Sequence, residues 1–81
     1  MRVQTIKSTN VNGHEVRVEA QQGFGAPKPG NSFAVDLIRP RDEDNPHNTI
    51  IGRVAGLSQA QALNIGSVIE TALMAGVEVK L

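Results

Sequence analysis

The sequence contains no cysteine, tryptophan or tyrosine, and its only aromatic residues are two phenylalanines. Without cysteine there can be no disulfide, thiol nucleophile, thiolate-bound zinc or iron–sulfur cluster, and nothing requires an oxidising compartment. The scarcity of aromatic residues argues against an RNA-recognition sheet, on which aromatic side chains stack bases. Contact with nucleic acid is therefore not indicated.

The chain also lacks an excess of charge and a long apolar run. Eight basic and eight acidic side chains give a formal net charge of zero, so no overall field favours nucleic acid or an anionic membrane. Residues 1–7 contain no apolar core of signal-peptide length, and no run approaches the length of a membrane span. We expect a soluble intracellular protein with no membrane partner.

The composition that remains is typical of a globular chain, with 40% hydrophobic and 20% charged side chains among 81 residues. A domain of this size buries only about 60% of the surface of its unfolded chain, which suits one helix packed on one sheet. No internal repeat or domain boundary is visible. We expect a single domain over residues 1–81.

One amphipathic helix is predicted from Ser58 to about Ala75. Ser58 is a good N-cap, and Gln61 stands where it completes a capping box. Helical spacing places one stripe of small and apolar residues on a single face: Ala62, Ile65, Gly66, Ile69, Ala72, Leu73 and Gly76. Gly66 predicts a close approach of the helix to a sheet, and Gly76 predicts the left-handed residue that ends the helix.

Four strands are predicted before the helix and one after it, at residues 2–8, 14–20, 33–38, 49–55 and 77–81. Asn12-Gly13 is a strong hairpin signal because both residues tolerate positive φ, so the first two strands should pair antiparallel. In the first strand, Val3 and Ile6 do not alternate cleanly. In the fourth, Gly52 predicts a bulge or a close approach by the helix.

These elements predict an α+β fold, a two-layer sandwich of a mainly antiparallel sheet of four or five strands with one helix, in the order β-β-β-β-α-β. The last two strands are either parallel, with the helix as a right-handed crossover, or antiparallel. The helix should cover an apolar sheet face that comprises Val16, Val18, Phe33, Val35, Leu37, Val54, Val77 and Val79.

The opposite sheet face is predicted to lack a cover. It would present a mostly charged set with two isoleucines, namely Glu15, Arg17, Glu19, Asp36, Ile38, Ile51, Arg53, Glu78 and Lys80. The favoured interpretation is a solvated face linked by cross-strand charge pairs. The alternative makes Ile38 and Ile51 the anchors of a partner or dimer contact.

Two polar loops interrupt the sheet. The first, residues 21–32, is rich in glycine and proline but has neither the P-loop ending nor the spacing of a dinucleotide-binding loop. Within it, Phe24 near Lys28 is either a flexible contact tip or a lid tucked over the edge of the core. The sequence therefore leaves both roles open for Phe24.

The second loop spans residues 39–48 and is locally zwitterionic, with Arg39, Arg41, Asp42, Glu43, Asp44 and His47. The absence of glycine and the presence of Pro46 break the pattern of an EF-hand, so no metal site is predicted. A solvated turn is the favoured interpretation, and a patch that docks to a protein is the alternative.

The sequence offers few residues that are suited to catalysis. His14 and His47 are the only side chains that ordinarily titrate near neutral pH, no serine lies in a nucleophile elbow, and no carboxylate pair can be assigned to acid and base roles. We expect neither an enzyme nor a bound cofactor, and the leading class is a small binding module that acts through its surface.

The order of elements, with a Gly-Arg-x-Ala strand end at Gly52-Arg53-Val54-Ala55, one Ala-rich helix and a closing strand, resembles small phage-encoded anti-CRISPR proteins. The resemblance covers size and element order across the chain. It implies an inhibitor in the cytoplasm of a bacterial host that blocks a larger defence complex. The implied protein-binding residues lie in the two loops. Phe24 would be an apolar anchor, and the other implied contacts are Lys28, Arg39, Arg41, Asp42, Glu43, Asp44 and His47.

Two other functions stay open. One is a small homo-oligomer, such as a homodimer, that binds a nucleotide or another small molecule at a subunit interface, with Leu63 and Met74 packing across a two-fold axis. The other is a structural or assembly protein of a virus or mobile element. Self-association would favour either of these over the inhibitor.

Overall fold

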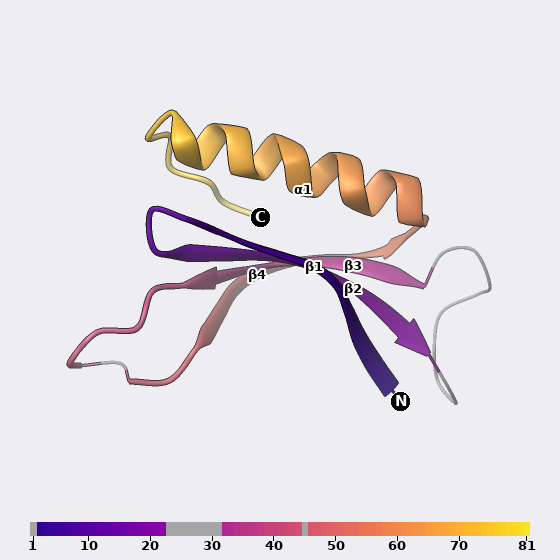
Figure 1. Cartoon of the computed structure of the whole chain (residues 1–81), viewed down its shortest axis with the longest axis horizontal. Coiled ribbons are helices and arrows are strands. Elements are labelled where there is room, and N and C mark those ends of the chain that lie inside the picture. Colours follow the sequence, from indigo (N-terminus) through magenta and orange to yellow (C-terminus); the bar gives the residue numbers. More distant parts are fainter. Residues whose placement is uncertain (1, 23–31, 45) are drawn as a thin grey trace.

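The structure is a computed structural model that describes residues 2–22, 32–44 and 46–81. Its elements are β1 (Arg2–Val11), β2 (His14–Gln22), β3 (Phe33–Arg39), β4 (Thr49–Leu57) and α1 (Gln59–Met74). The strands form one sheet in the order β1-β2-β3-β4, and each neighbouring pair is antiparallel. The helix lies along one face of this twisted sheet (Figure 1), which confirms the predicted α+β architecture.

The hairpin between β1 and β2 forms as predicted. Val11 pairs with His14, which leaves a two-residue turn of Asn12 and Gly13. Both turn residues have positive φ, 52° and 84°, as a type I′ turn requires. The Asn-Gly pair thus fixes the register of the first two strands.

An irregularity in β1 explains why its apolar residues do not alternate. Thr5 pairs with Glu19 and Lys7 pairs with Val18, so Ile6 is an extra residue in a bulge. After the bulge, Lys7 lies on the helix-facing side, where its ammonium group is 3.5 Å from the carboxylate of Glu70 on α1. The predicted strand forms, but the bulge changes which of its residues point toward the helix.

The helix begins and ends at the predicted residues. The Ser58 hydroxyl accepts a hydrogen bond from the Gln61 backbone N–H at 3.2 Å, and the Gln61 side chain accepts one from the Ser58 N–H at 2.9 Å. At the other end Gly76 has φ 76°, and the N–H of Val77 donates to the Ala72 carbonyl at 3.0 Å. These bonds are a capping box and a Schellman motif.

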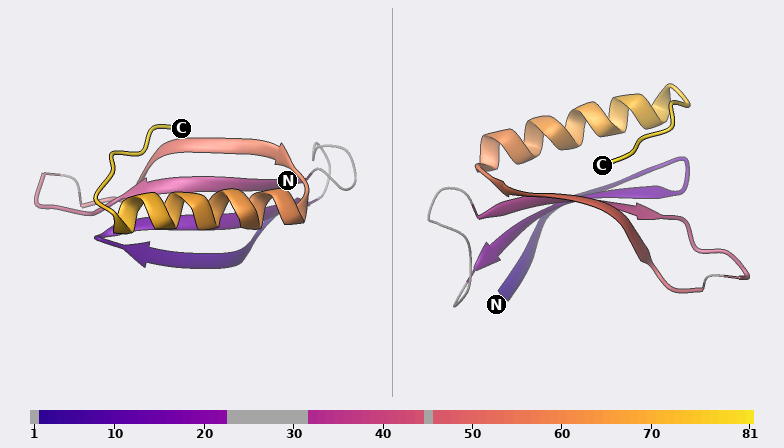
Figure 2. Two further views of the ribbon diagram at one scale, coloured as in Figure 1. Left: turned by 90° about the horizontal axis from the view of Figure 1, so that it is seen from above. Right: turned by 180° about the vertical axis from the view of Figure 1, so that it is seen from behind.

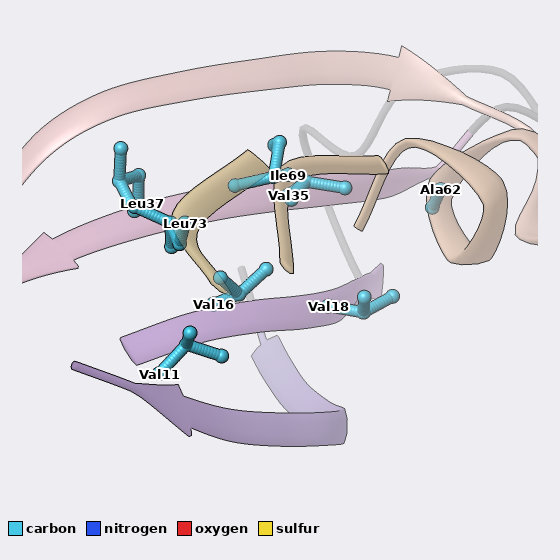
Figure 3. Close-up of a cluster of buried hydrophobic side chains, with 8 residues drawn as sticks. All are labelled: Val11, Val16, Val18, Val35, Leu37, Ala62, Ile69 and Leu73. Carbon is cyan, nitrogen blue, oxygen red and sulfur yellow. The ribbon is translucent and has the colours of Figure 1, made fainter. Parts of the chain in front are cut away.

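The hydrophobic core lies between α1 and the sheet (Figure 3). Its members are aliphatic residues of β1, β2 and β3 and three residues of the predicted stripe of α1: Val11, Val16, Val18, Val35, Leu37, Ala62, Ile69 and Leu73. At Gly66 an added Cβ would lie 3.2 Å from Cγ2 of Val18. This spacing confirms the close approach of helix to sheet, because a larger residue there would press on Val18.

The predicted fifth strand does not form. Residues 77–81 run back from the end of α1 on the helix side of the sheet, beside β4 (Figure 2), without pairing as a strand. Val77 is exposed, contrary to the expectation, whereas Val79 packs partly against the core. The question of parallel or antiparallel pairing with β4 therefore does not arise for this segment.

Gly52 owes its close contact to the carboxyl-terminal residues and not to the helix. A Cβ added at Gly52 would lie 2.6 Å from Cβ of Leu81, so Leu81 occupies the space that a side chain would need. The register also shifts beside it, because Leu37 pairs with Gly52 while Ile38 pairs with Ile50. The predicted irregularity therefore lies beside Gly52, whereas the predicted close approach by the helix is wrong.

Within the residues that the structure describes, no helix has the length and apolar character needed to cross a membrane.

Candidate interaction surface

The sheet face opposite α1 carries a cluster of five charged side chains, which we call the open-face cluster. It consists of Glu15, Arg17 and Glu19 on β2, Asp36 on β3 and Arg53 on β4. Strand register brings them together, because Arg17 pairs with Asp36 and Asp36 pairs with Arg53 across three adjacent strands. Alternation along β2 then places Glu15 and Glu19 on either side of that row.

Two bidentate ion pairs organise the cluster. The Arg53 guanidinium donates to both oxygens of Asp36, at 2.6 Å and 3.0 Å. The Arg17 guanidinium donates to both oxygens of Glu15, at 2.9 Å and 3.1 Å, and the Ser8 hydroxyl adds a third bond to Glu15. Each arginine therefore directs its fork of donors at one carboxylate.

Glu19 is the carboxylate without such a partner. Its oxygens lie 3.8 Å from Arg17 and 3.6 Å from Arg53, and Oε2 is buried without a hydrogen-bond partner. Its side chain is only 4% exposed. Burial, together with the neighbouring Asp36 carboxylate, raises the pKa of Glu19 to about 7.

The other carboxylates shift in the opposite direction. Burial alone would raise the pKa of Asp36, but hydrogen bonds from Arg53 and Glu19 outweigh it and leave that pKa below its ordinary value. Hydrogen bonds from Arg17 and then Ser8 lower the pKa of Glu15. At neutral pH the cluster therefore shares a proton mainly at Glu19, next to an ionised Asp36.

These observations partly correct the sequence-based picture of this face. Cross-strand charge pairing is confirmed, but a fully solvated face is wrong, since Glu19 and Asp36 are buried. Ile38 is also wrong as an exposed anchor, because it is 2% exposed, whereas Ile51 is 46% exposed. The imbalance of three acids and two bases on alternating strand positions was the signal that could have identified the cluster.

The second loop connects the end of β3 with the start of β4. Arg39 is half-buried at the end of β3, with its Nε buried and without a hydrogen-bond partner within the described part of the chain. Arg41 is exposed and donates from Nε to the Asn48 side-chain oxygen at 2.8 Å. Asp42, Glu43, Asp44 and His47 are all exposed. Phe24 and Lys28 lie outside the described residues.

The loop continues directly into apolar residues that the sequence did not single out together. Residues 41–44 and 46–51 are all exposed, and Ile50 and Ile51 are 48% and 46% exposed at the start of β4. We call this stretch the loop–β4 surface. It joins the charged loop to the open-face side of the sheet, because Ile50 pairs with Ile38 and Ile38 pairs with Glu15.

The described residues do not enclose a pocket, and no three of their histidine or acidic side chains are grouped as metal ligands would be. His14 is half-buried beside the hairpin, and His47 is exposed in the second loop. The features that the surface does offer are a charged loop, two neighbouring isoleucines and a partly buried ion cluster. No protein family matches this chain, and neither the curated proteins nor the solved structures with which it was compared gave a match.

Proposed function

We propose that this protein is a small non-enzymatic binding module that recognises another protein through the loop–β4 surface. The observation that carries this proposal is the exposure of every described residue from 41 to 51, with Ile50 and Ile51 next to a charged loop. Protein interfaces commonly have an apolar centre inside a charged or polar rim. The loop–β4 surface has both parts within its ten described positions, residues 41–44 and 46–51.

The two parts would contribute differently to binding. Burying the exposed half of each isoleucine would contribute about 1 kcal/mol per residue, since full burial is worth roughly 1.5–3 kcal/mol. The charges would mainly set the association rate and the choice of partner. Among the described loop residues 41–44, three carboxylates outnumber the one guanidinium, so the complementary surface would be basic.

The resemblance to phage anti-CRISPR proteins supplies the partner class for this proposal. The partner would be a bacterial defence complex, and the module would inhibit that complex by occupying one of the complex's functional surfaces. Such complexes offer basic surfaces because they bind nucleic acid, and an acidic loop would complement them.

Affinity capture from a bacterial host lysate tests the proposed function. Tagged native protein should retain one protein complex in stoichiometric amount, identified by mass spectrometry. The double variant Ile50→Ser/Ile51→Ser and the charge reversal Asp42→Lys/Glu43→Lys/Asp44→Lys should each lose most of it. Val68→Ser is the matched control, because Val68 is an apolar side chain, 64% exposed, on α1 in the other layer.

Capture that is equal for native protein and both surface variants would overturn the proposed surface. Capture of no protein at all would overturn the proposed function. Circular dichroism of each variant at the working temperature would show that the fold is intact, as we expect for exposed positions.

A homo-oligomer is the second candidate, and one observation favours it. Leu63 and Met74 are both exposed on α1 and stand eleven positions apart, which is about three helical turns, so they share one side of the helix. A two-fold contact along that side would bury both. A monomer mass that does not change with concentration would eliminate this candidate, whereas a dimer lost in Leu63→Ser/Met74→Ser would establish it.

A further inference from the structure

The open-face cluster contains one more negative group than positive groups. Its two guanidinium groups are each engaged in a bidentate pair, with Glu15 and with Asp36. The third carboxylate, Glu19, has only the longer contacts of 3.6 Å and 3.8 Å to those same arginines as ion pairs, and its other neighbour, Asp36, is also an acid. A buried carboxylate in this situation must either hold a proton or gain another cation.

We propose that the open face binds a basic side chain of a partner protein, which pairs with Glu19 as the third cation of the cluster and displaces the proton held there. This inference rests on the proposed protein-binding function and names the chemistry of the partner. The buried Oε2 of Glu19, which has no hydrogen-bond partner, is the acceptor that the incoming group would satisfy.

The surroundings of Glu19 fit an incoming cation. Its cross-strand neighbours are Thr5 on β1 and Ala34 on β3, both of which are small. The charged groups that face it are Arg17 and Glu15 on its own strand, Asp36 on β3 and Arg53 on β4. Lys7 of β1 lies on the opposite face, where it pairs with Glu70.

Access to Glu19 depends on the two arginines. Their side chains are 29% and 44% exposed, so their ends reach solvent and can change rotamer without disturbing the core. The helix and the carboxyl-terminal residues both lie on the other side of the sheet (Figure 2). A long lysine or arginine side chain that approaches from the open side would meet Arg17 and Arg53 first, and one of them would have to change rotamer to admit it.

The same partner can contact this site and the loop–β4 surface. Glu19 pairs with Ala34, and Ile50 pairs with Ile38 on the same strand, so the two positions are four residues apart along β3. At 3.3–3.4 Å per residue along β3, and with β2 and β4 each 4.7–4.9 Å to one side of it, the two positions are about 16 Å apart, which is well inside a standard interface of about 800 Å² per partner. The excess negative charge of the loop would favour the same basic partner.

A defined peptide pair tests the inference without knowledge of the natural partner. The probe is a blocked peptide with four arginines separated by glycines, and its control has citrulline, the neutral analogue, in place of arginine. Binding is measured by NMR titration at low ionic strength at pH 6 and pH 8. Because Glu19 has a pKa of about 7, the ionised fraction rises about tenfold over this range, and the affinity should rise roughly tenfold with it.

Three comparisons decide the outcome. Glu19→Gln should abolish the tenfold pH effect that native protein shows, and because this variant retains both histidines, loss of the effect would assign it to Glu19. Asp42→Asn/Glu43→Gln/Asp44→Asn should weaken binding at both pH values and leave their ratio unchanged. The citrulline peptide should not bind.

The inference is overturned if Glu19→Gln binds the arginine peptide as native protein does, if only loop amides shift, or if native protein does not bind it at pH 8. Its failure is separable from failure of the proposed function. A chain that captures a protein through the loop–β4 surface but shows no Glu19-dependent peptide binding would retain the function and lose the cation site.

Discussion

The side-chain amide of Asn12 donates a hydrogen bond of 2.9 Å to the backbone carbonyl of Leu73, a residue 61 positions away in the chain. Asn12 belongs to the turn between β1 and β2, and Leu73 lies in the last turn of α1, where its carbonyl also accepts the N–H of Gly76 at 3.0 Å. One side chain thus serves the hairpin through its positive φ and the helix through its amide. The contact ties the end of the helix layer to the sheet layer.

Asn12→Gly should separate these two roles, because glycine keeps the left-handed turn and removes the amide. We expect a loss of about 1 kcal/mol in the free energy of unfolding, the usual value of one such hydrogen bond. Urea denaturation of native and variant protein measures it. An unchanged midpoint would show that water replaces the amide at no cost.

Ile69→Ala should remove a central core contact. Ile69 is buried between α1 and the sheet, so truncation should lower the free energy of unfolding by about 2–5 kcal/mol. Val68→Ala on the adjacent, exposed position is the matched control and should change it by less than about 0.5 kcal/mol. Equal effects from the two variants would mean that the assigned helix face is wrong.

Gly52→Ala should displace the carboxyl-terminal residues, because the added Cβ would lie 2.6 Å from Cβ of Leu81. Overpacking of this kind typically costs about 1–3 kcal/mol. In a Leu81→Gly background the same substitution should cost less, and a double-mutant cycle measures the difference. Additive effects would indicate that Leu81 does not rest on Gly52 in solution.

The stability of the protein should fall as pH rises from about 4.5 to about 7. Glu19 has its pKa raised from 4.5 to about 7 in the folded chain, so in this window the folded state binds more protons than the unfolded state. Deprotonation of Glu19 therefore costs stability that is fully present below pH 4.5. Thermal unfolding across this pH range in native protein and in Glu19→Gln measures the contribution.

Glu19→Gln should remove this slope and should be more stable than native protein at pH 8, since an amide next to Asp36 carries no charge. Asp36 and Glu15 act in the opposite sense, because their lowered pKa values give stability that is lost as pH falls below their ordinary range. A native slope of zero between pH 5 and pH 7 would contradict the assignment of the proton to Glu19.

For the candidate site, the sequence identified the second loop but not the surface to which it belongs. Asp42, Glu43, Asp44 and His47 are exposed as a loop of that composition should be. Whether Ile38, Ile50 or Ile51 would accompany them depended on a register shift in the pairing of β3 with β4. A shift of one residue changes which side chains face outward, and no local pattern fixes it.

What the sequence determined by itself is local. Three features depend on residues within a few positions of one another and can therefore be predicted from the sequence. They are the capping box of Ser58 and Gln61, the turn of Asn12 and Gly13, and the helix end at Gly76.

Only the tertiary structure decided the conformation of residues 77–81. Their apolar and charged side chains alternate as in a strand, but the segment lies beside β4 on the helix side of the sheet. A single helix leaves room on that face, and Leu81 rests on Gly52 there. The tertiary structure also decided the burial of Glu19 and Asp36. β2, β3 and β4 must first align before Arg17 and Arg53 can lie against these two carboxylates. Alternation predicts which face a residue takes, whereas burial depends on what the rest of the fold places above that face.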